Sequence, residues 1–305
     1  MKFIIVFGAV FVLSCATLIP LKVSDSLDIQ VEITSERVEA GRYLADNVML
    51  CNHCHSEVDW DYYGGYIPEE TLGGGGEPFK EWFGEVYGTN VTPAALKDWT
   101  DGEIAQAITE GVHKSGKSLF PVMPYPTYRT LAKEDLVALI AYLRSMKPVE
   151  NSIPPKKLNF PFKYIERTIP AKYEPISKPN PDNSIEYGEY LATMGDCIRC
   201  HTPFDNKGQI FEDQLFRGGN KFKIPIGTEI YSTNISSDVD DGIGGWTRED
   251  FIELFKERSE PRKVEPQFNT IMAWQSYSGM KEADLGAIYD FIMSSPPIKN
   301  KETPE

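Results

Sequence analysis

Most of the chain repeats itself once, and this duplication constrains the fold more than any other feature of the sequence. The segment CNHCH at residues 51–55 recurs as CIRCH at residues 197–201, an offset of 146 residues. Each segment follows a G-x-Y-L-A pentapeptide, at 41–45 and 188–192. A period of this length indicates a duplicated domain and not a short solenoid repeat. The sequence therefore predicts two copies of one fold in tandem.

The correspondence continues beyond the cysteine motifs. YGTNV at 87–91 matches YSTNI at 231–235, and a Trp-Thr pair follows in each copy. Met123 and Met272 are each followed by a tyrosine five residues later and by Asp-Leu twelve residues later. The repeats predict domains at 33–148 and 184–298.

The two copies carry the same helical signals. Thr100-x-x-Glu103 and Thr247-x-x-Asp250 form capping boxes, which predict that a helix begins after each threonine. Apolar residues at helical spacing predict helices over 134–146 and 283–293. Helices also fit 36–49 and 184–194, just before each CxxCH motif. Alternation typical of strands is scarce, so the predicted fold class is mainly α.

A proline-rich segment separates the copies. It holds eight prolines between Pro148 and Pro181, which disfavour helix and favour extended chain. We interpret residues 149–183 as a linker whose aromatic side chains lie along the domain surfaces, with a loose linker as the alternative. Residues 299–305 are expected to form a frayed tail.

The N-terminus has the layout of an export signal. One lysine precedes an apolar run over residues 3–13, and small residues follow. Three outcomes compete for residues 1–20: a lipoprotein signal cut before Cys15, ordinary cleavage after Ala16, or an uncleaved membrane anchor. Two of the three tether the protein to the membrane. We expect a periplasmic or other extracytoplasmic location on a bacterial membrane.

Charge restricts the partners. Thirty-one Lys and Arg residues against 45 Asp and Glu residues give a net charge of −14. This balance argues against nucleic acid and against an anionic membrane surface as ligands. It leaves a protein partner with a basic docking face.

The CxxCH motifs narrow the chemistry to three alternatives. Zinc needs four ligands in a tetrahedron, and residues 51–55 are too crowded to surround an ion. A redox dithiol gives no reason for a histidine after both pairs. Covalent haem explains every position, because two thiols bond the porphyrin and the next histidine lies under the iron. Two haems are therefore predicted, attached through Cys51, Cys54, Cys197 and Cys200, with His55 and His201 as axial ligands.

The sixth iron ligand decides what such a haem does. Met123 follows His55 by 68 residues and Met272 follows His201 by 71, so these methionines are the candidates. Prolines on both sides fix the Met123 loop, whereas the Met272 loop lacks them. The rival in the first copy is His113. His53 lies inside the attachment loop, and we predict that it faces solvent.

With these residues placed, the chain resembles a dihaem c-type cytochrome built from two class I cytochrome c domains. The second copy is similar to the cytochrome c subunits of membrane-bound alcohol and gluconate dehydrogenases, through GTEIYSTNI, GIGGWTREDF and SGMKEADLGAIYDFI. The resemblance implies that Gly41 and Gly188 allow close helix crossings and that Met123 and Met272 are the sixth ligands. Those subunits typically carry three haems, where this chain has two motifs.

The expected function is electron transfer between respiratory partners, such as a membrane dehydrogenase or a terminal oxidase. Six-coordinate His/Met iron mostly passes electrons. An enzyme is the alternative, either a dihaem peroxidase or a small-molecule oxidoreductase of the thiosulfate dehydrogenase type. Either enzyme needs one open haem site.

Overall fold

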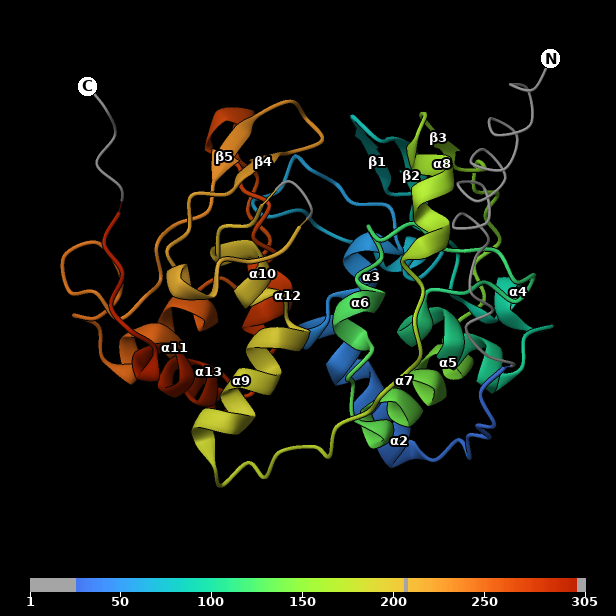
Figure 1. Ribbon diagram of the computed structural model, residues 1–305, viewed down its shortest axis with the longest axis horizontal. Helices are drawn as coiled ribbons and strands as arrows, with labels where there is room; N and C mark the ends of the chain where they lie inside the picture. The colour runs from blue at the N-terminus through green and yellow to red at the C-terminus, as the bar shows by residue number, and fades with distance from the viewer. Residues whose placement is uncertain (1–25, 206–207, 301–305) are drawn as a thin grey trace, which may run out of the picture.

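Two helix pairs dominate the computed structural model, which describes residues 26–205 and 208–300 (Figure 1). In the first repeat α2 (Ser35–Tyr43) packs on α7 (Lys133–Ser145). In the second repeat α9 (Ser184–Met194) packs on α13 (Glu282–Ser294). These helices agree with the predicted ones to within about a turn, except that the first continues as the π-helical η1 (Leu44–Val48).

A glycine sits at each of the two helix crossings. A Cβ added to Gly41 would lie 1.9 Å from the carbonyl oxygen of Ala138, and one added to Gly188 would lie 1.9 Å from that of Ala287. Only a residue without a side chain fits at such a distance. The close approach that the cytochrome resemblance implied is confirmed.

Capping boxes start the next helix of each repeat, as predicted. Thr100 accepts from the amide of Glu103, whose carboxylate accepts from the amide of Thr100. Thr247 and Asp250 make the same two bonds. The helices that begin here are α5 (Asp101–Glu110) and α11 (Arg248–Lys256).

The strands are only two to four residues long, and every longer element is a helix, which confirms the mainly α prediction. The strands form two small antiparallel sheets: β1 (Pro78–Glu81), β2 (Gly84–Tyr87) and β3 (Lys157–Leu158) in one, β4 (Lys221–Lys223) and β5 (Glu229–Tyr231) in the other. Pro78 pairs with Tyr87, and Lys221 with Tyr231. The short helices are α3 (Cys51–Cys54), η2 (Glu69–Thr71), α4 (Pro93–Leu96), α6 (Tyr125–Tyr128), α8 (Phe162–Ile165), η3 (Glu166–Thr168), α10 (Cys197–His201), η4 (Glu212–Gln214), η5 (Pro266–Phe268) and α12 (Trp274–Ser278).

Two hydrogen bonds between tyrosine and aspartate join the repeats symmetrically. Tyr43 donates to Asp284, and Tyr190 donates to Asp135 over 2.6 Å. The two tyrosines occupy matching repeat positions, as do the two aspartates. Each repeat therefore offers the same patch to the other, as in a two-fold dimer interface.

The segment between the repeats runs along the first one. Residues 157–158 add strand β3 to β2, and Tyr173 donates to the carbonyl of Leu131 over 2.7 Å. Lys178 forms an ion pair with Asp135.

The predicted signal at 1–20, including Cys15, lies outside the described residues, as do residues 301–305 of the tail. Across residues 26–205 and 208–300 the helices are all too short or too polar to cross a membrane.

Candidate functional site

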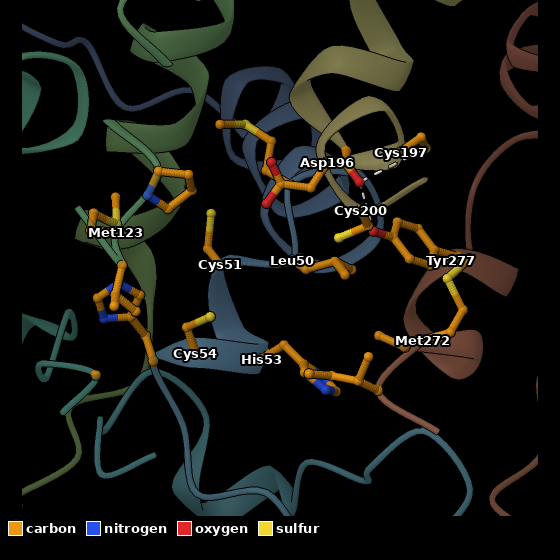
Figure 2. A pocket seen from close by; sticks show the side chains of 18 of the residues that line it. Leu50, Cys51, His53, Cys54, Met123, Asp196, Cys197, Cys200, Met272 and Tyr277 are labelled. Carbon is orange, nitrogen blue, oxygen red and sulfur yellow. Dashed lines mark hydrogen bonds between the residues drawn. The ribbon is translucent and has the colours of Figure 1, made fainter. Parts of the chain in front are cut away.

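Each CxxCH motif forms a short helical turn that begins with a left-handed residue. Leu50 has φ +52° before α3, and Asp196 has φ +58° before α10. Non-glycine residues rarely adopt this conformation, so both turns are held by their surroundings. Figure 2 shows Leu50 and Asp196 between the cysteines of the first motif and those of the second.

The four motif cysteines are not paired in disulfides, and they line a cavity. Burial raises the pKa of each thiol to about 12. A redox-active CxxC has the opposite property, a lowered pKa that exposes a reactive thiolate. Among the described residues, no three His, Cys, Asp or Glu side chains gather as a metal-binding cluster. These facts fit neither a redox dithiol nor a zinc site.

The motif histidines are fixed in one orientation by the same contact. Nδ1 of His55 bonds the carbonyl oxygen of Thr89 over 2.7 Å, and Nδ1 of His201 bonds that of Thr233 over 2.8 Å. Burial lowers the pKa of both imidazoles, which keeps the rings neutral. A neutral ring that donates from one nitrogen presents the other to a metal. The sequence pointed to the T-N segments as repeat markers but did not reveal this role.

One cavity of about 1800 Å³ reaches both motifs. Met123 and Met272 line it together with the motif cysteines and histidines, and most of the other lining side chains are apolar. Figure 2 shows Met123 beside Cys51 and Cys54, and Met272 at the other end beside Tyr277. At each end of the cavity, the donor atoms and the apolar space fit a covalent haem with one His/Met pair.

The other two histidines of the first repeat lie apart from that pattern. His113 lines the cavity, but its Nδ1 bonds the hydroxyl of Ser115 over 2.8 Å and its ring lies edge-on to Trp99. His53 is half-buried, and both of its ring nitrogens are shielded from solvent without a hydrogen bond, so the prediction that it faces solvent was wrong. A later segment of the first repeat folds back over it, with Trp60 edge-on to its ring.

The two motifs lie close enough to interact electrostatically. Burial raises the pKa of Cys54 in the first repeat, and the carboxylate of Asp196 in the second repeat raises it further. Tyr277 donates to the carbonyl of Gly195 over 2.7 Å, and a Cβ at Gly195 would lie 3.1 Å from the carbonyl oxygen of Val48 in the first repeat. The packing of the repeats thus places the two CxxCH motifs next to each other.

Comparison with known proteins adds a family context. The chain is 28% identical over 284 residues to the cytochrome c subunit of the quinone alcohol dehydrogenase of Gluconacetobacter polyoxogenes, which covers 87% of this chain and 57% of that protein. It is 27% identical over 281 residues to the cytochrome c subunit of gluconate 2-dehydrogenase from Pantoea cypripedii, covering 84% and 59%. Most of the chain is homologous to dehydrogenase cytochrome c subunits.

A diheme cytochrome c-type protein of Cereibacter sphaeroides is 26% identical over 137 residues, covering 45% of each chain. No family model matches the sequence. The chain spans little more than half the length of the dehydrogenase cytochrome c subunits that it matches. These cytochrome c homologues imply covalently bound haem.

Proposed function

We propose that the protein is a dihaem c-type cytochrome that carries single electrons between respiratory partners outside the cytoplasmic membrane. The observation that carries this proposal is the cavity in which both CxxCH motifs meet both repeat-matched methionines. Bound haem iron supplies a one-electron redox couple. The chain supplies attachment, axial ligands and a dry environment.

Each residue of the site has a role in this proposal. Cys51 and Cys54 hold one haem and Cys197 and Cys200 the other, each through two thioether bonds. The proximal ligands are His55 and His201, and the sixth ligands are Met123 and Met272. A methionine ligand raises the reduction potential, which suits the oxidising end of a respiratory chain.

Each haem belongs to one of two class I cytochrome c domains, 33–148 and 184–298, with 149–183 as the linker. The symmetric bonds from Tyr43 and Tyr190 support this division, because they fix the separation of two similar units. A fixed separation allows electrons to exchange within one molecule.

The partners follow from the relatives and from the charge. Several relatives are dehydrogenase cytochrome subunits, which supports a dehydrogenase as electron donor. The net charge of −14 favours a basic docking face on the partner, and a terminal oxidase is the proposed acceptor class. Export through residues 1–20, with Cys15 as the lipidation site, would keep the cytochrome at the membrane.

The test is the absorption spectrum of the oxidised protein. Methionine bound to ferric haem gives a weak long-wavelength band, and the wild-type protein should show it at both sites. Met123→Ala and Met272→Ala should each remove about half of the band. An unchanged band in either variant would contradict the corresponding ligand.

A further inference from the structure

A loop of the first repeat lies over the methionine loop of the second. We call residues 57–66, which follow the first CxxCH motif, the brace loop. Tyr63 donates from its amide to the carbonyl of Arg262 over 2.8 Å, and Val264 donates back to Asp61 over 3.0 Å. The two segments therefore pair through their backbones, although about 200 residues separate them in sequence.

Asn269 is the centre of this contact. Its side chain is buried, and its Nδ2 donates to the carbonyl oxygens of Trp60 over 2.7 Å and Tyr62 over 3.2 Å. Its Oδ1 accepts from the amide of Gly64 over 3.0 Å. One side chain, three residues before Met272, thus binds three backbone groups of the brace loop.

Gly64 touches the backbone of the methionine itself. Its φ is +78°, and a Cβ at this position would lie 2.4 Å from the carbonyl oxygen of Met272. It would also lie 3.3 Å from the amide nitrogen of Trp274. A side chain here would push the Met272 backbone out of place, because backbone atoms cannot move aside without moving the loop.

The two methionine loops differ in what fixes them. In the first repeat Pro121 and Pro124 restrict the backbone on both sides of Met123. The second loop has Asn269 at the position of Phe120 and Ala273 at that of Pro124. Besides the bond that the Met272 amide donates to the hydroxyl of Thr270, its constraint comes from outside, through the brace loop.

We propose that Asn269 is a positioning residue for Met272, and that the brace loop of the first repeat sets the sixth ligand of the second site. This inference rests on the proposed function, in which Met272 binds iron. His53 extends the connection, because its ring packs edge-on against Trp60 with centroids 5.7 Å apart. A change in the first repeat should therefore alter ligation in the second.

The test uses the intact protein with both haems attached. Gly64→Ala and Asn269→Ala should each remove about half of the methionine-to-iron band, as Met272→Ala does, and should lower the potential of one haem only. Both variants leave every predicted ligand in place.

Two control variants separate positioning from general damage. Gly116→Ala has nearly the same backbone strain, with φ +74°, but its added methyl meets no atom within 4 Å. Gln267→Ala removes an exposed side chain two residues before Asn269. Both controls should keep the whole band.

The outcomes distinguish this inference from the ligand assignment. If Met272→Ala leaves the band unchanged, the ligand assignment fails. If Met272→Ala halves the band but Gly64→Ala and Asn269→Ala leave it whole, Met272 is confirmed as the ligand. The positioning role of Asn269 and the brace loop is then refuted. Should Gly64→Ala fail to fold, Asn269→Ala decides alone, because it adds no atom.

Discussion

The symmetric tyrosine bonds between the repeats give a quantitative prediction. Tyr190 donates to Asp135 and accepts from the amide of Ala132 over 3.4 Å. Tyr190→Phe keeps the buried ring and removes only the hydroxyl, so packing is preserved. The change should lower the free energy of unfolding and loosen the contact between the repeats.

The size of the effect follows from the partners that remain. A hydrogen bond to a charged group contributes about 1.5–3 kcal/mol. Asp135 keeps its ion pair with Lys178, so the carboxylate is not left without a partner. We expect a loss of about 2 kcal/mol for Tyr190→Phe. Tyr43→Phe removes the equivalent bond to Asp284 and should cost about the same.

Urea denaturation followed by circular dichroism measures these losses. The two bonds share no partner, so the double variant should lose about 4 kcal/mol. A loss below about 0.5 kcal/mol in both single variants would refute the claim that these bonds hold the repeats together.

Three further predictions follow. Burial raises the pKa of Tyr190, and the interaction with Asp135 raises it further. Above about pH 10 the tyrosine of the unfolded chain therefore releases a proton that the folded protein keeps. The free energy of unfolding should therefore fall as pH rises beyond that point, and constant stability from pH 9 to 11 would contradict this. Gly188→Ala should cost about 3 kcal/mol in denaturant unfolding, because its methyl would meet a carbonyl of helix α13; Gly245→Ala, whose added methyl would meet no atom closer than 3.9 Å, is the control. Replacing Cys197 and Cys200 with serine should reduce covalent haem from two to one per chain by intact-protein mass, and a chain that keeps two would contradict the attachment sites.

Local sequence signals predicted the helices well. The capping boxes at Thr100 and Thr247 placed two helix starts correctly, because their bonds lie within four residues. Helix α9 (Ser184–Met194) matches its predicted bounds. The repeat also pointed to the two motifs and the two methionines that meet in the cavity.

The contacts between distant segments could not be predicted in this way. His53 was expected to face solvent, but the brace loop lies over it. An antiparallel β-bridge between Asp59 and Tyr66 closes that loop. Asn269 was passed over for a similar reason, because its partners lie in the other repeat.

Carbon monoxide binding tests the central claim most directly. The proposal requires that both irons have two protein ligands, His55 with Met123 and His201 with Met272. The reduced protein at neutral pH should then bind no carbon monoxide, with an absorption spectrum unchanged by the gas. Stoichiometric binding of one carbon monoxide per chain would show an open site and would contradict the electron-carrier account.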